Sequence, residues 1–142
     1  MLPFEEDEFV NEACGDQSGV VFYGQPANGL WIDTLAVSDI YVGPLFGAIW
    51  KRSAKAPPSP PAPRLIADWN CHQGWTHAHR IVEISRHEAE ELVDALATLS
   101  AGELAAQSSV TFPEKALRCA TAIRDFLRSC LDRHEPVYIA DN

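Results

Sequence analysis

The second half of the chain contains two helix-start signals, and these constrain the fold more than any other feature of the sequence. Ser85-Arg-His-Glu88 and Thr111-Phe-Pro-Glu114 both match the capping box, in which a hydroxyl and a glutamate three residues later satisfy free backbone amides. Apolar residues follow each box at helical spacing, up to Gly102 after the first box and to about His134 after the second. We therefore predict two amphipathic helices.

Each predicted helix has one apolar stripe that needs a core to cover it. The stripes are Ala89, Leu92, Val93, Leu96 and Leu99 on the first helix, and Ala116, Ala120, Ile123, Leu127 and Cys130 on the second. Cys119 and Cys130 return to nearly the same helix face, so we expect two buried thiols rather than a disulfide framework.

The first half of the chain has the composition of a sheet. Residues 20–24, 29–39 and 41–51 are short runs rich in β-branched and aromatic residues, and turn-forming residues separate them. A short helix over residues 4–13 precedes them, and residues 137–140 after Pro136 are expected to return as a last strand. The prediction is a single α+β domain over residues 1–142, a two-layer structure whose mainly antiparallel sheet carries the two C-terminal-half helices on one face.

A proline-rich segment interrupts the strand pattern. In residues 51–63, KRSAKAPPSPPAP, five of the last seven residues are proline, which favours an extended polyproline conformation. We interpret it as a stiff basic loop within one domain. The alternative is a ligand for an aromatic groove on another protein, which would make the chain a regulatory or scaffold domain.

The segment Asp68–Arg80, DWNCHQGWTHAHR, is the densest cluster of chemically active side chains. Residues 64–69 and 75–84 are strand-like and residues 70–74 form a short loop with a glycine, so we predict a β-hairpin. If Trp69 faces Trp75, then His77 and His79 share their face of the hairpin. Cys71, His72, His77 and His79 could then bind a metal or form a small catalytic centre, and contact or packing is the alternative role.

Two segments resemble enzyme motifs, but each lacks a residue that the motif requires. The helix sequence HEAEE has Glu91 where a zinc protease needs its second histidine, and GDQSG has Asp16 where a nucleophile elbow needs glycine. The sequence therefore predicts a binding protein without a cofactor or metal. The acidic start and the short apolar runs predict a cytoplasmic protein that does not bind a membrane.

Charge is distributed unevenly along the chain. The first fifty residues contain eight acidic residues and no lysine or arginine, whereas the remainder contains eleven basic and twelve acidic residues. Such a field repels nucleic acid and accelerates the encounter with a basic partner.

The cation-free residues 1–50, the strand run Leu30–Asp39 and the sequence ISRHEAEELVDALATLSAGE give the chain a resemblance to the immunity proteins of bacterial polymorphic-toxin systems. These systems include contact-dependent inhibition and type VI secretion. The resemblance implies a stoichiometric inhibitor, made in the cytoplasm, that covers the active site of a cationic toxin, often a nuclease.

The predicted partner-binding residues follow from charge and aromatic content. Acidic groups would match the basic surface of the toxin, and Trp and Tyr dominate the energetics of protein interfaces. The predicted contact residues are Glu5, Glu6, Asp7, Glu8, Asp33 and Asp39 for charge, and Trp31, Trp75, His77 and His79 as anchors.

Overall fold

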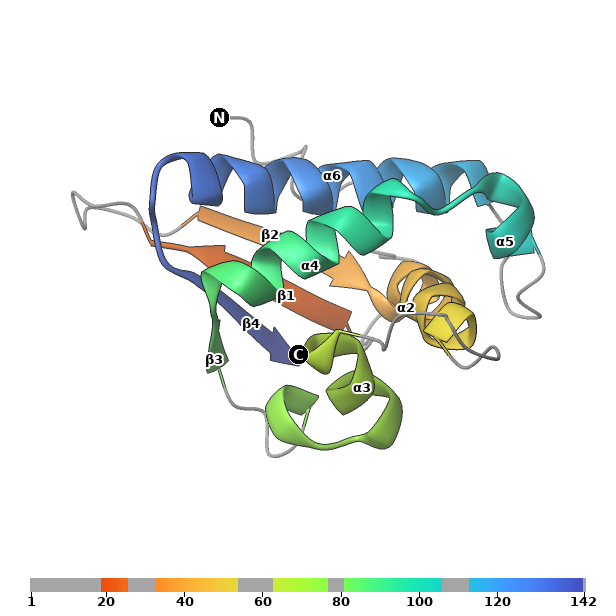
Figure 1. Cartoon of the computed structure of the whole chain (residues 1–142), viewed down its shortest axis with the longest axis horizontal. Coiled ribbons are helices and arrows are strands. Elements are labelled where there is room, and N and C mark those ends of the chain that lie inside the picture. Colours follow the sequence, from red (N-terminus) through yellow and green to blue (C-terminus); the bar gives the residue numbers. More distant parts are fainter. Residues whose placement is uncertain (1–18, 26–32, 54–62, 77–80, 106–112, 142) are drawn as a thin grey trace.

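Four strands form one antiparallel sheet, with helices packed against it (Figure 1). The structure is a computed structural model, and it describes residues 19–25, 33–53, 63–76, 81–105 and 113–141. The strands are β1 (Gly19–Gly24), β2 (Asp33–Ser38), β3 (Ile81–Ile84) and β4 (Val137–Asp141), in the order β2-β1-β4-β3. The predicted last strand is confirmed, and it lies between β1 and β3 in the interior of the sheet.

The two faces of the sheet differ in burial. In β1, Val20 and Phe22 are buried, whereas Val21 and Tyr23, which alternate with them, are half-buried. The register places Phe22 beside Leu35 and Ile139, which are also buried. This alternation with a period of two gives the sheet one face that belongs to the core.

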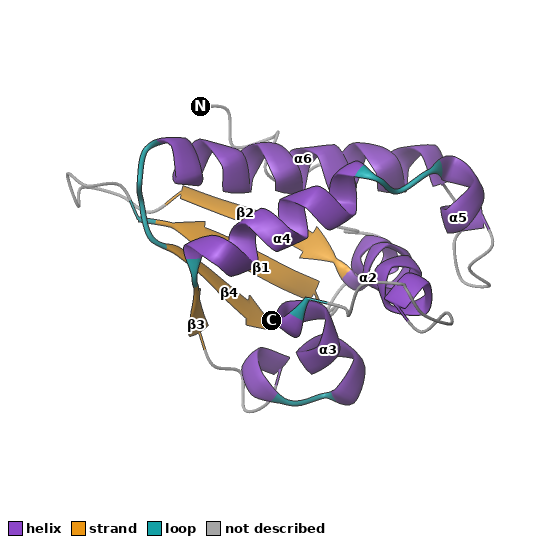
Figure 2. Ribbon diagram, viewed as in Figure 1, coloured by secondary structure: helices purple, strands orange, loops and turns teal. Residues whose placement is uncertain are grey.

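Two helices cover that face, as the capping boxes predicted (Figure 2). They are α4 (Arg86–Ala97) and α6 (Pro113–Asp132). Both predicted stripes are buried, and so is the thiol of Cys119. In the first box, Ser85 Oγ accepts from the amide of Glu88 at 3.1 Å, and the amide of Ser85 donates to Glu88 Oε1 at 3.0 Å. Thr111 of the second box lies outside the described residues.

The predicted end of the first helix at Gly102 is wrong. α4 ends at Ala97, and a separate helix, α5 (Ala101–Ala105), contains Gly102 in its first turn. A third capping box starts α5, because the amide of Glu103 donates to Ser100 Oγ and the amide of Ser100 donates to Glu103 Oε1, both at 3.2 Å. The sequence pattern Ser100-Ala-Gly-Glu103 contains this signal, which the prediction overlooked.

Residues 41–51 form a helix and not the predicted third strand. They belong to α2 (Asp39–Ser53), which contains Pro44 and Gly43. Tyr41, Val42 and the apolar residues that follow are buried on nearly every side, because α2 packs against β1, β2 and four other helices. A helix that is buried all round has no polar stripe, so its sequence lacks the helical period and resembles a buried strand.

The predicted β-hairpin of residues 64–84 is also wrong. Residues 64–69 belong to helix α3 (Arg64–Cys71), and a short 3-10 helix, η2 (Gly74–Thr76), follows. Of the second predicted strand, Ile81–Ile84 is confirmed as β3. His72 ends α3 in the left-handed conformation, with a φ of 53°. Trp75 does not face Trp69 on a surface hairpin, because its side chain is buried in the core.

Gly74 allows the left-handed backbone conformation of the turn between α3 and η2. Its φ is +58°, and a Cβ at this position would lie 2.1 Å from Asp68 Oδ2. We expect Gly74→Ala to lower the free energy of unfolding by about 2 kcal/mol, from left-handed strain and this clash. The matched variant Gly102→Ala lies in a helix, where the new Cβ would make only an ordinary contact with Ser100 Oγ at 3.8 Å. We expect it to be neutral or to stabilise by up to about 1 kcal/mol. Urea unfolding of both variants measures the difference, and equal effects would contradict the assigned turn.

Arg64 links α3 to the start of α4. Its Nε donates to Glu88 Oε2, and its Nη1 lies 3.6 Å from Asp68 Oδ2. The hydrogen bond from Arg64 is the main cause that lowers the pKa of Glu88 below its ordinary value of 4.5.

A lowered pKa in the folded state means that Glu88 stabilises the fold above its ordinary pKa, and that this stabilisation is lost as the pH falls through the folded value. We expect Glu88→Gln to cost about 1 kcal/mol at neutral pH, because one charge-assisted hydrogen bond is lost. The cost should shrink as the pH falls below 4.5 and through the lower pKa of the folded state, because the wild-type carboxyl then becomes protonated. Urea unfolding at neutral pH and at a series of pH values below 4.5 tests this, and a pH-independent cost would assign Glu88 a capping role alone.

No helix in the described ranges combines the length and the apolar character that crossing a membrane requires.

Candidate functional site

Many of the predicted contact residues lie outside the part of the chain that the structure describes. These are Glu5, Glu6, Asp7, Glu8, Trp31, His77 and His79. Trp75 is 1% exposed, and its indole Nε1 donates to the backbone oxygen of Leu65 at 2.9 Å. Trp75 is therefore a core residue, and its side chain is not exposed to a partner.

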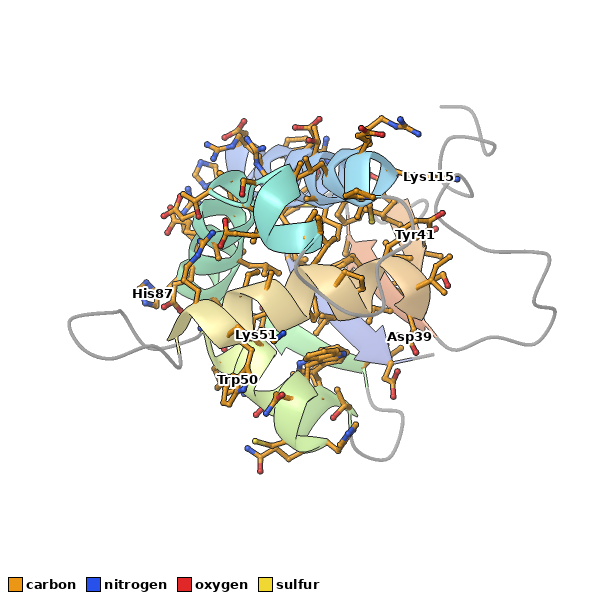
Figure 3. All side chains as sticks on the ribbon, turned by 90° about the vertical axis from the view of Figure 1, so that its right-hand side faces the viewer. Asp39, Tyr41, Trp50, Lys51, His87 and Lys115 are labelled. Carbon is orange, nitrogen blue, oxygen red and sulfur yellow. The ribbon has the colours of Figure 1, made fainter. Side chains whose placement is uncertain are left out.

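The two predicted acidic residues that are described do not form one patch. Asp33 begins β2 and Asp39 directly follows it, so about 20 Å of extended chain separates them. Asp33 Oδ2 lies 3.5 Å from Arg133 Nη2, so part of its charge is matched within the chain. Asp39 lies at the start of α2 with much of the residue exposed (Figure 3). Partial burial of its carboxyl group, and secondarily the negative charge of the neighbouring Asp141, raise the pKa of Asp39.

The candidate metal cluster is not assembled by the described residues. Cys71 and His72 are both exposed at the end of α3. Among the described residues no group of three or more His, Cys, Asp or Glu side chains could hold a metal ion. The other two members of the predicted set, His77 and His79, are outside the described ranges.

A groove between α4 and α6 is the most distinctive charged feature of the described surface. The two helices run antiparallel, so the start of α4 lies beside the end of α6, and Arg86 Nη1 donates to the backbone oxygen of Leu131 at 3.1 Å. The groove has a volume of about 380 Å³. It is lined by Arg86, His87, Glu90, Glu91, Val93 and Asp94 of α4, and by Arg128, Leu131 and Asp132 of α6.

A second hollow of about 300 Å³ adjoins the groove and shares Arg86 and Leu131 with it. It extends the concave surface toward β3 and the turn before β4, where Glu83 and Glu135 line it. The combined surface therefore runs from the middle of α4 to one edge of the sheet.

Helical spacing explains why charged side chains line the groove. Arg86, Glu90 and Asp94 are spaced by four residues, so they share one side of α4, and Arg128 and Asp132 share one side of α6 in the same way. His87 projects from the outer side of α4 (Figure 3). The lining contains four carboxylates, two guanidinium groups and one imidazole, so the groove is acidic.

Few of these charges are neutralised inside the chain. Arg86 Nε lies 4.0 Å from Glu90 Oε2, and His87 Nε2 lies 3.6 Å from Glu91 Oε1. Exposed pairs at such distances are weak. The side chains of Asp94, Arg128 and Asp132 form no hydrogen bond or ion pair with any residue that the structure describes.

The chemistry of the lining suits the binding of charged groups. It contains carboxylates, guanidinium groups and an imidazole around the apolar side chains of Val93 and Leu131, but no serine, threonine or cysteine that could act as a nucleophile. Sequence reasoning missed the groove. Glu90, Glu91 and Asp94 sit in the predicted helix and could have been recognised as an acidic exposed side, whereas their meeting with Arg128 and Asp132 required the packing of α4 on α6.

The described chain defines an α+β protein with one antiparallel sheet and a charged groove on its helical layer. Comparison with known protein families, with curated proteins and with solved structures finds no match to this chain.

Proposed function

We propose that this chain is an immunity-type protein that binds and neutralises a cationic toxin, and that the acidic groove between α4 and α6 is part of its contact surface. The observation that carries this proposal is the excess of carboxylates in the groove, of which Asp94 and Asp132 have no partner among the described residues. A basic partner would supply the missing counter-charges.

Charge on the whole chain supports the same kind of partner. The formal net charge is −9, so a cationic protein is attracted before any contact forms. A nuclease is the class of toxin that we expect, because its active site is basic in order to bind phosphates. Carboxylates on α4 and α6 could occupy the places that those phosphates take.

The first test is the gene directly upstream, which we expect to encode a large secreted protein whose variable C-terminal domain is the toxin. We expect co-expression of this chain to protect cells from that domain, and the two purified proteins to form a complex. The association rate constant should fall at least tenfold between low and high salt, because salt shortens the range of electrostatic steering to about 8 Å at physiological ionic strength. Failure to protect cells, or an association rate indifferent to salt, would overturn the proposal.

A further inference from the structure

Arg128 is the residue of the groove for which a purely basic partner would supply no counter-charge. Its guanidinium lines an acidic groove and yet forms no hydrogen bond or ion pair within the described ranges. Asp132 follows it by one helical turn, about 6 Å along α6, and forms none either. A guanidinium at this place repels the basic side chains that the carboxylates attract.

The packing of the helices places Arg128 across the groove from the acidic part of α4. Arg86 and Leu131 mark one end of the groove through their hydrogen bond. Because the helices are antiparallel, moving one turn away from this end leads to Glu90 on α4 and to Arg128 on α6. Neither Glu90 nor Asp94 comes within ion-pair distance of Arg128 in the described structure, so the opposite charges face each other across open space.

Arg124 adds a second guanidinium to the same side of α6. It precedes Arg128 by four residues, which places both on one side of the helix. Arg124 is half-buried, and its Nε is buried without a hydrogen-bond partner in the described part of the chain. Arg124 is not part of the groove lining and its Nε is buried, so Arg128 is the guanidinium of α6 that an anionic group entering the groove can reach.

We infer that the partner segment that enters this groove carries a carboxylate side chain flanked by basic side chains. Its basic groups pair with Glu90, Asp94 and Asp132, and its carboxylate pairs with Arg128. A segment with basic groups alone would satisfy the carboxylates and leave Arg128 opposed by like charge. This inference rests on the proposed function, and it names the chemistry of the segment that the groove selects.

The inference is tested by NMR titration of the full-length, isotope-labelled protein with two alanine-rich helical peptides. The first carries lysine, glutamate and lysine one helical turn apart, and the second has glutamine in place of the glutamate. We expect the first peptide to bind about threefold more tightly, which lies within the range of one exposed ion pair. Net charge alone predicts the opposite order, because the second peptide is more positive and the protein is acidic.

Two variants assign the preference to the groove. In Arg128→Gln the preference for the first peptide should disappear, whereas in Asp125→Asn, an exposed residue of α6 outside the groove lining, it should remain. If the second peptide binds equally well or better, and Arg128→Gln tightens its binding, the inference is overturned while the groove still binds cations. If neither peptide shifts the resonances of α4 and α6, the groove itself is not a binding site, and the inference fails together with that part of the proposed function.

Discussion

Replacing both Glu90 and Asp94 with lysine is expected to weaken the complex with the cationic toxin domain about 100-fold. Both carboxylates line the groove from one side of α4, and neither is held by a close ion pair in the described structure. The double variant turns two attractive contacts into repulsive ones, and like charges brought together in an interface cost several kcal/mol. A 100-fold rise in Kd corresponds to about 2.7 kcal/mol.

The control for this prediction changes the net charge equally at another place. Glu114 and Asp125 are exposed on α6 and do not line the groove. We expect Glu114→Lys combined with Asp125→Lys to slow association moderately through the weaker long-range field, with little change in the dissociation rate. Surface plasmon resonance separates the two rates. If both double variants weaken the complex equally, net charge and not the groove controls binding.

Replacing Trp75 with alanine is expected to lower the free energy of unfolding by about 3–5 kcal/mol, which is the usual cost of removing a large buried aromatic side chain. Of the described residues, Trp75 has one of the largest fully buried side chains, and its indole Nε1 donates a hydrogen bond to the backbone oxygen of Leu65. A protein of this size has about 5–15 kcal/mol of stability, so the variant should unfold at a much lower urea concentration.

Two further variants identify the cause of the Trp75 effect. Trp75→Phe keeps most of the buried volume and removes the hydrogen bond, so we expect a loss of about 1–2 kcal/mol. Trp69 is half-buried and meets Phe46 edge to face at 5.6 Å, so Trp69→Ala should cost less than Trp75→Ala. Urea unfolding monitored by circular dichroism measures all three. A cost below about 1 kcal/mol for Trp75→Ala would indicate that the side chain is exposed.

Sequence reasoning was most successful where local chemistry decides structure. The capping box at Ser85 and Glu88, and the apolar stripes of α4 and α6, were predicted because helix caps and helical periodicity act within a few residues. The β-branched and aromatic residues of 20–24 identified β1 for the same reason, since such side chains suit the surface of a strand.

Sequence reasoning failed in the two places where the surroundings decide structure. The apolar residues of α2 fit a buried strand as well as a buried helix, and the choice depends on the elements that enclose them. The segment around Trp75 was predicted as a hairpin because two strand-like runs flank a short loop with a glycine. Packing instead places the indole inside the core.

The candidate site was only partly accessible to prediction. The preference for a cationic partner follows from the composition of the chain, and it remains a proposal about function. The position of the groove does not follow from composition, because Asp94 and Arg128 are distant in the sequence and meet only through the antiparallel packing of two helices.

The sequence by itself determined the α+β class, the two helices of the C-terminal half and the acidic character of the chain, because caps, periodicity and charge are local properties. Only the tertiary structure decided the burial of Trp75 and of α2, and the position of the groove. Trp75 and the residues of α2 are buried because neighbouring elements enclose them, and the carboxylates of α4 line a groove because α6 packs beside them. Burial by distant elements, and proximity between residues far apart in the sequence, are properties of the packed chain that no local pattern encodes.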